Sequence, residues 1–305
     1  MSVSIMVGKS GDNPATPDFQ QMRDAVEARL GDMVPPGTGP AVAARHSLLA
    51  PGKRLRAILT MIAAEECGGD ARSALDAACA VEMVHTASLV FDDLPAMDDA
   101  ELRRGVKTPH VLYGVDVAIL AGIGLLNGAF GAIAGSVSLN DAQKTKMTRI
   151  LSDAVGWSGL VGGQALDLTS GQNAASLEEI HDGKTGVLFE AAVLCGAVVG
   201  DAFEKMEPGF RAYATSLGRA YQAFDDILDQ VADDGLAGKS TARDDGKLTA
   251  LTGKEGLDDA LGSAAQHLDA AKAALPVPAN QASPLRLFAD SIYEHFKTTF
   301  AKAAG

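Results

Sequence analysis

The chain consists of apolar helical runs separated by short polar or glycine-rich segments, and no alternating strand pattern of useful length lies between them. The short segments lie at 33–40, 68–70, 138–141, 170–176, 206–209 and 276–284. An amphipathic helix is predicted from about Asp18 to Leu30. The first 16 residues, rich in Gly, Ser, Asn and Pro, predict a flexible leader. We therefore expect a single all-α domain over residues 17–305.

The composition supports helices and excludes several classes of protein. Hydrophobic residues make up 47% of the chain but aromatic residues only 5%, which favours packed helices over short β-rich strands. The net charge of -13 disfavours nucleic acid and anionic membranes as partners. The three cysteines form no CxxC pair, and no basic and apolar signal opens the chain. These features predict a cytoplasmic protein with buried cysteines.

The run from Val115 to Ile133 comes closest to a membrane-spanning segment. Its glycines and other small residues favour a helix buried within a helical core instead. We therefore expect no stable membrane insertion.

Two aspartate clusters, each at the end of an apolar helical run, are the strongest functional signal. The first is Asp92-Asp93-Leu-Pro-Ala-Met-Asp98-Asp99. Carboxylates at a helix C-terminus oppose the negative end of the helix dipole by about 0.3–1 kcal/mol each, so we expect a positive partner there. Pro95 forces a kink or bulge that can bring Asp92 and Asp98 to the same side.

The second cluster, Asp225-Asp226-Ile-Leu-Asp229, needs no such kink, because residues three and four positions apart share one face of a helix. Such carboxylates suit Mg²⁺, which takes one or two protein carboxylates and bridges to substrate phosphates. Either cluster alone could also be a solvated acidic surface, since aspartate is common at helix ends and turns.

Basic residues accompany the first cluster. Arg103 and Arg104 follow it directly, and Lys53, Arg54 and Arg56 begin an apolar helix upstream. Arginine matches phosphate geometry with two parallel hydrogen bonds and does not lose its charge. Together these residues predict two anion sites, one of them beside a metal site.

With these residues, the sequence resembles the trans-isoprenyl diphosphate synthases, or polyprenyl synthetases, and most closely the bacterial geranylgeranyl diphosphate synthases of carotenoid biosynthesis. The resemblance spans about residues 45–300 and rests on GKRLRA at 52–57, VEMVHTASLVFDDLPAMDDAELRRG at 81–105, GLVGGQALDL at 159–168, GKTG at 183–186 and YQAFDDILD at 221–229. It implies the isoprenoid synthase fold, in which antiparallel helices surround a deep central cavity, and a homodimer. It also implies a Mg²⁺-dependent prenyltransferase that joins isopentenyl diphosphate head to tail to dimethylallyl, geranyl or farnesyl diphosphate.

The same resemblance implies a role for each matching residue. The expected ligands of isopentenyl diphosphate are Lys53, Arg56, His85 and Arg104, and that of the allylic diphosphate is Arg103. The expected ligands of magnesium, three ions by the family's pattern, are Asp92, Asp98 and Asp225, supported by Asp93, Asp226 and Asp229. The leaving diphosphate is expected to meet Lys184 and Lys239, and the carbocation to face the oxygens of Thr185 and Gln222. The residues expected to line the site are Gln164 and Asp167.

The residues one and two turns before Asp92 set the expected product length. A helix rises about 1.5 Å per residue, so one turn is close to the depth of one isoprene unit. Ala87 and Ser88 stand where a bulky aromatic residue would close the cavity early, and Met83 is expected near its floor. This predicts growth to geranylgeranyl diphosphate (C20), with farnesyl diphosphate (C15) as the alternative. The small residues could instead serve only close helix packing.

Two other functions share parts of this pattern. A class I terpene cyclase uses an all-α cavity and a metal-bound diphosphate, but it needs no isopentenyl site. A non-catalytic subunit would keep the fold without turnover, although both aspartate clusters are complete. The sequence leaves open the preferred primer and the residue that caps the isopentenyl site at the C-terminus.

Overall fold

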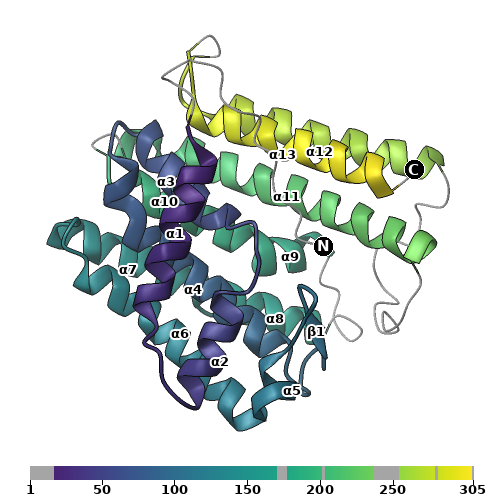
Figure 1. Ribbon diagram of the computed structural model, residues 1–305. Coiled ribbons are helices and arrows are strands. Elements are labelled where there is room, and N and C mark those ends of the chain that lie inside the picture. The colour runs from purple at the N-terminus through teal and green to yellow at the C-terminus, as the bar shows by residue number, and fades with distance from the viewer. Residues whose placement is uncertain (1–16, 170–176, 201–202, 237–253, 279–280, 304–305) are drawn as a thin grey trace.

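The computed structural model describes residues 17–169, 177–200, 203–236, 254–278 and 281–303, so the predicted leader lies outside the described residues. The chain is a bundle of helices (Figure 1), which confirms the all-α prediction. The helices are α1 Phe19–Met33, α2 Pro40–Leu48, α3 Leu55–Glu66, α4 Leu75–Asp92, α5 Pro109–Tyr113, α6 Val115–Gly135, α7 Asp141–Val155, α8 Leu160–Leu168, α9 Leu177–His181, α10 Val187–Ala197, α11 Phe203–Leu236, α12 Lys254–Ala274 and α13 Pro284–Ala303. The remaining elements are a 3₁₀ turn, η1 Ala71–Ala74, a π-helical turn, η2 Asp182–Gly186, and a hairpin of β1 Leu102–Arg103 and β2 Val106–Lys107.

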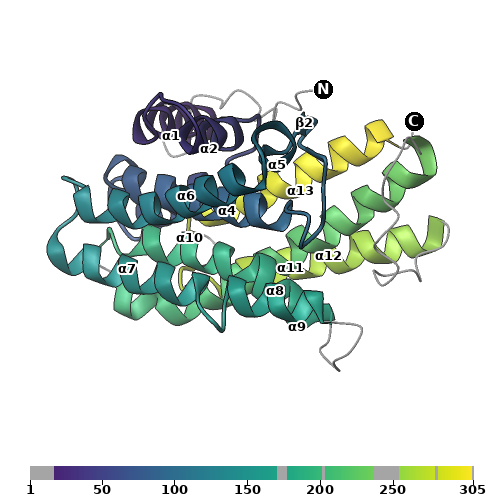
Figure 2. The same ribbon diagram turned by 90° about the horizontal axis from the view of Figure 1, so that it is seen from below.

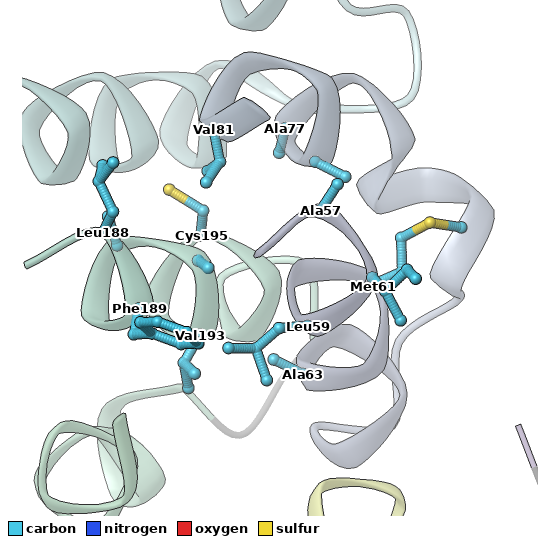
Figure 3. Packing of buried hydrophobic residues seen from close by; sticks show 14 of the residues in the cluster. Ala57, Leu59, Met61, Ala63, Ala77, Val81, Leu188, Phe189, Val193 and Cys195 are labelled. Carbon is cyan, nitrogen blue, oxygen red and sulfur yellow. The ribbon is translucent and has the colours of Figure 1, made fainter. Parts of the chain in front are cut away.

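Helix α10 forms the centre of the bundle, with α1, α2, α4 and α6 on one side of it and α11 and α12 on another (Figure 2). It is buried along nearly its whole length, and its residues are apolar or small apart from Glu190. Gly196 faces the carbonyl of Thr60 on α3 so closely that a Cβ would not fit. Figure 3 shows Leu59 and Ala63 of α3 beside Val193 of α10. Small residues thus let these two helices approach closely.

The three cysteines are free and buried, as the composition predicted. Burial raises the pKa of the Cys67 thiol to about 12. Thiolate is the reactive form of cysteine, so this thiol is inert at neutral pH.

The predicted break at 206–209 is wrong, because α11 continues through Pro208. This proline stands near the start of the helix and removes only the hydrogen bond to the carbonyl of Glu204, a residue whose side chain is exposed. Burial of Phe210 and Tyr213 on the same helix compensates for that loss. The chain leaves its helical path earlier, at 198–200. The breaks at 33–40, 68–70, 138–141 and 276–284 are confirmed, and 170–176 lies outside the described residues.

Within the described residues, two helical stretches are long and apolar enough to cross a membrane, Ala71–Asp92 and Val115–Gly135. Length and composition alone give this result, and core helices of soluble proteins share it. The most apolar window is 67% buried in the first stretch but 33% buried in the second. Helix α6 packs against α4 and leaves Ile119, Leu120 and Ile123 exposed. The expected core helix is therefore buried on one face only.

Candidate active site

The first aspartate cluster lies at the end of α4, where the chain turns back on itself. The helix ends at Asp92 rather than continuing through a kink at Pro95. The N–H of Asp98 donates to the carbonyl of Asp92 at 2.9 Å, and Asp99 takes a left-handed backbone with φ 51°. This turn brings Asp98 beside Asp92, as the sequence predicted.

Burial makes the charged form of the Asp92 carboxyl unfavourable. Burial raises the pKa of Asp92 to about 6, although the positive charges of Lys184 and Arg103 act against this, and the negative charges of Asp98 and Asp93 raise it further. Oxygen ligands in this arrangement fit Mg²⁺. Among the residues that the structure describes, no three His, Cys, Asp or Glu side chains gather into a ready-made metal site. Magnesium bound here would complete its ligands with phosphate and water.

The hairpin brings two arginines to the cluster. Strands β1 and β2 pair antiparallel, and the turn between them consists of Arg104 and Gly105 with φ values of 54° and 79°, as a type I′ turn requires. The Nε of Arg103 donates to Oδ1 of Asp93 at 2.8 Å, and its Nη2 lies 3.9 Å from Asp98. Arg103 therefore stands at the first aspartate cluster, and Arg104 at the turn reaches a different group.

Two polar residues that the sequence did not single out anchor the hairpin. His46 on α2 makes a hydrogen bond through Nε2 to the carbonyl of Lys107 at 2.8 Å. The buried Thr108 donates to the carbonyl of Ala100 at 2.8 Å. His46 is separated from its partner by 61 positions, so no local pattern could have revealed this contact.

Arg56, His85 and Arg104 meet in a basic group at the beginning of α3. Nη1 of Arg56 and Nη2 of Arg104 lie 3.3 and 3.4 Å from Nε2 of His85. Burial and these two positive charges hold the pKa of His85 well below its usual range, so the neutral ring accepts both bonds. Gly52 leaves room for the group, because a Cβ there would lie 2.8 Å from Nη1 of Arg104. The remaining guanidinium donors are available to an anion.

Lys53 extends this group towards α11. Its Nζ lies 5.0 Å from the ring centre of Phe296 and 6.0 Å from that of Tyr221. Burial lowers the pKa of Lys53, while the negative charge of Asp225 raises it. The first residue of the second aspartate cluster therefore faces the basic group.

A buried ion pair that sequence reasoning missed sets the position of the basic group. Nη1 of Arg54 lies 3.1 Å from Oε1 of Glu82, and the two residues are only 3% and 2% exposed. Glu82 precedes His85 by one helical turn on α4, and Arg54 stands between Lys53 and Arg56. The signal in the sequence was a single glutamate inside an otherwise apolar run. The pair ties the start of α3 to α4.

Helices α8 and α11 and the π-helical turn η2 form a further wall. Lys184 of η2 forms an ion pair with Asp167 of α8. The hydroxyl of Thr185 donates to Oε1 of Gln222 on α11 at 3.0 Å. Nε2 of Gln164 lies 3.8 Å from the sulfur of Met97, which ties α8 to the loop of the first cluster. The structure thus brings together the residues that the sequence predicted on these elements.

The residues ahead of Asp92 lie against α6. Met83 and Ala87 are buried, and Cε of Met83 lies 2.6 Å from the place that a Cβ on Gly128 would take. The ring of Phe91 lies 2.7 Å from the place that a Cβ on Gly122 of α6 would take. Ala87 is one turn from both large side chains, so it is the small residue in a stripe of α4 that faces α6. Ser88 is half-buried.

The side chains of three predicted site residues lie outside the part of the chain that the structure describes: Asp226, Asp229 and Lys239. The backbone of α11 is helical through both aspartates. Their predicted shared face is therefore consistent with the helix, and the roles of all three residues stay predictions.

Comparisons with known proteins agree with this geometry. The chain matches the family model described as Polyprenyl synthetase over residues 41–259. Geranylgeranyl pyrophosphate synthase 7 of Arabidopsis thaliana is 46% identical over 208 residues, which cover 66% of this chain and 60% of that one. Geranylgeranyl diphosphate synthase of Pseudescherichia vulneris is 36% identical over 299 residues, 94% of each chain. The crystal structure of a geranylgeranyl pyrophosphate synthetase from Pyrococcus horikoshii matches with a TM-score of 0.77 and 27% identity, over 91% of this chain and 96% of that chain.

The helical bundle, the paired aspartate clusters and their basic partners define a prenyltransferase of the isoprenoid synthase fold. The chain belongs to the polyprenyl synthetase family, whose members condense isopentenyl diphosphate with allylic diphosphates and generally depend on Mg²⁺.

Proposed function

We propose that the protein makes geranylgeranyl diphosphate from isopentenyl diphosphate and shorter allylic diphosphates, with three magnesium ions at the aspartate clusters. The observation that carries the product length is the small side chain of Ala87, which stands between Met83 and Phe91 on the stripe of α4 that faces α6. A small residue there leaves depth for a long prenyl chain. Relatives named as geranylgeranyl diphosphate synthases support this product.

The allylic diphosphate is assigned to the first aspartate cluster. Arg103 and Lys184 both place positive charge near Asp92, where a phosphate group can be held. Magnesium held by Asp92 and Asp98 would neutralise the negative charge that develops on the leaving diphosphate. The hydroxyl of Thr185 donates its hydrogen bond to Oε1 of Gln222, so the oxygen lone pairs of Thr185 can face a cation at the reacting carbon.

Isopentenyl diphosphate is assigned to the basic group of Lys53, Arg56, His85 and Arg104. The two guanidinium groups share one neutral acceptor, His85, and direct their other donors at the anion. From this position the isopentenyl double bond attacks the allylic carbon. The allylic C–O bond breaks with its electron pair moving to diphosphate, a new C–C bond forms, and the departing diphosphate takes the proton lost from the isopentenyl unit. No side-chain nucleophile is needed.

The assay that tests this function supplies isopentenyl diphosphate, Mg²⁺ and each of the three allylic primers, and measures the chain length of the dephosphorylated products. We expect a C20 product that forms only when isopentenyl diphosphate is present. Accumulation of C15 alone would assign farnesyl diphosphate synthesis. Product from an allylic diphosphate alone would indicate a cyclase, and no product from any primer would indicate a non-catalytic subunit.

The substitution Ala87→Tyr is expected to move the product from C20 to C15 or shorter, because a ring one helical turn before Asp92 would stop the growing chain about one isoprene unit earlier. Buried Ala87 has close neighbours, so overpacking of about 1–3 kcal/mol is also expected. Product length is measured by chromatography, and folding by thermal denaturation. Ser88→Phe, at a half-buried position, is the companion variant. Unchanged C20 product in two folded, active variants would contradict this account of the product length.

A homodimer is proposed as the assembly, with α6 at the interface. Four large apolar residues on this helix are exposed: Val115 at 43%, Ile119 at 38%, Leu120 at 53% and Ile123 at 52%. Val111 and Leu112 of the adjacent α5 add to the same apolar surface, at 40% and 43% exposure. A contiguous apolar surface of this kind favours a partner of the same character, and a second copy presents that character itself.

The variant Leu120→Glu is expected to convert the dimer to monomer, because two carboxylates would be buried at the interface without partners. Light scattering coupled to size-exclusion chromatography measures the change. Leu287→Glu on α13, an exposed leucine away from α6, is the matched control and should stay dimeric. A monomeric wild-type protein would exclude the proposed assembly.

A further inference from the structure

One stretch of the site departs from regular helix geometry, at η2. Residues Asp182–Gly186 form a π-helical turn between α9 and α10, and the residues on both sides, His181 and Val187, have ordinary helical backbone angles. A π-helical turn is rare, and it rotates the side chains within it away from their α-helical directions. Lys184 and Thr185 are inside this turn. Where these two side chains point therefore depends on keeping the turn in its π-helical form.

Close backbone approaches support η2 at its two glycines. A Cβ added to Gly163 of α8 would lie 2.6 Å from the carbonyl carbon of Gly183. A Cβ added to Gly218 of α11 would lie 3.2 Å from the Cα of Gly186. A cavity of about 400 Å³ lies beside the turn, and its lining includes Asp182, Gly183 and Gly186 of η2 together with Gly163 of α8. Two glycines inside the turn also give its backbone more freedom than other residues would. Among the described residues, the cavity thus leaves space beside η2 into which the turn can relax.

A single arginine of α11 holds the start of the turn. Nε and Nη2 of Arg219 on α11 donate to the two carboxylate oxygens of Asp182, at 3.2 and 2.7 Å. Nη1 of the same guanidinium lies 2.5 Å from Oε1 of Glu178 on α9. Asp182 begins the π-helical turn, and Glu178 stands four residues earlier on the regular helix. The guanidinium group of Arg219 therefore binds the chain on both sides of the junction between the α-helical and the π-helical backbone.

Arg219 also couples this junction to the second aspartate cluster. It precedes Gln222, the partner of Thr185, by three residues, so both contacts to η2 come from one face of α11. Asp225 follows three residues later on the same helix. Helix α11 thus holds η2 at two points and carries an aspartate of the metal motif beyond them.

We propose that Arg219 is a positioning residue that keeps η2 in its π-helical form and thereby aims Lys184 at the leaving diphosphate and Thr185 at the developing cation. It contacts no substrate itself. The inference rests on the proposed role of Lys184 and Thr185. The opposing explanation is an ordinary surface ion pair, since Arg219 and Asp182 side chains are 35% and 36% exposed.

The chain offers a matched control for this test. Arg211 lies on the same helix, is 47% exposed, and pairs with Glu190 of α10 and with Glu207. The variants Arg219→Gln and Arg211→Gln each remove one guanidinium of α11 and leave two carboxylates without that partner: Glu178 and Asp182 in the first variant, Glu190 and Glu207 in the second. A merely structural role would give the two variants the same kinetics.

We expect Arg219→Gln to lower kcat by about 10- to 100-fold with the KM for isopentenyl diphosphate changed less than about threefold, because displaced groups lose alignment with the reacting atoms. Arg211→Gln should keep wild-type kcat. Arg219→Lys, which keeps the charge but loses the fork, should give an intermediate kcat. In a Thr185→Ala background, Arg219→Gln should cost much less than it does alone, because the two act through one segment.

Amide hydrogen exchange of residues 178–187 provides a readout that does not depend on turnover. We expect exchange there to be about tenfold faster in Arg219→Gln than in wild type or Arg211→Gln. Equal exchange and equal kcat in the two glutamine variants would overturn the proposal, and so would full additivity with Thr185→Ala. Wild-type protein without activity on any primer would refute the proposed function, while the exchange comparison would still decide whether Arg219 clamps η2.

Discussion

In the variant Asp92→Asn, turnover is expected to fall by about a thousandfold or more, while the metal-free protein becomes more stable at pH 7.5. The loss of turnover follows from removing a carboxylate that would hold magnesium against the leaving diphosphate. The gain in stability follows from removing a buried negative charge that lies among other carboxylates. Asp92 thus serves the proposed chemistry at a cost to the folded state.

The pH dependence of the stability gain has a definite sign. Burial raises the folded-state pKa of Asp92 from 3.8 to about 6. A raised pKa means that the folded state binds the Asp92 proton more tightly than the unfolded chain does. Protonation therefore favours the folded state at pH values below 3.8, and this contribution to stability is lost as the pH rises through about 6. The neutral asparagine avoids that loss, so its advantage should be about 3 kcal/mol above pH 7 and should vanish near pH 4.

Thermal denaturation in a metal chelator between pH 4 and pH 8 measures this difference. Asp153→Asn is the control, because Asp153 is 74% exposed at the end of α7 and makes only a surface pair with Arg149. The control should change neither turnover nor the pH profile. An Asp92→Asn protein that keeps a tenth of wild-type turnover, or that is less stable than wild type at pH 7.5, would contradict the assignment.

The second large effect is expected from Gly163→Ala, which should lower turnover about a hundredfold and destabilise the fold by about 1–3 kcal/mol. The new Cβ would lie 2.6 Å from the carbonyl carbon of Gly183 and 2.8 Å from the amide nitrogen of Lys184. Both atoms belong to the backbone, so no side-chain rotation relieves the clash. Helix α8 and η2 must move apart, and Lys184 moves with them.

Steady-state kinetics and thermal denaturation measure both effects. Gly262→Ala on α12 is the control, because no atom lies within 4 Å of its new Cβ. Alanine favours a helix over glycine by about 1 kcal/mol, so this variant should be slightly more stable and fully active. If Gly163→Ala were as active as the control, the close approach of α8 to η2 would have no part in placing Lys184.

Local sequence patterns predicted much of the fold, and they failed where packing overrode a local preference. The sequence at 206–209 has the proline and glycine of a turn, yet α11 continues through Pro208 because its apolar residues are buried against the core. Helix α6 reads as a core helix from its composition, but it exposes one apolar face. An apolar periodic pattern shows that one face of a helix is hydrophobic. It does not show whether that face packs inside the same chain or remains exposed on its surface.

The site divides in the same way. The two aspartate clusters and Arg103 with Arg104 were readable because each is contiguous in the sequence and its spacing follows helix or turn geometry. The contacts of His46, Glu82 and Arg219 were not readable, because each joins elements that are distant along the chain. Such pairs exist only after the helices have packed.

The sequence alone determined the helical class through its apolar helical runs and the kind of chemistry through its aspartate clusters, because helix periodicity and carboxylate spacing are local properties of the chain. Only the tertiary structure decided how that chemistry is held. It raised the pKa of Asp92 through burial beside Asp98, placed two arginines on a neutral His85, and gave η2 a π-helical turn with Arg219 across its junction. Burial, shared acceptors and backbone close approach depend on which helices become neighbours, and no local pattern contains that information.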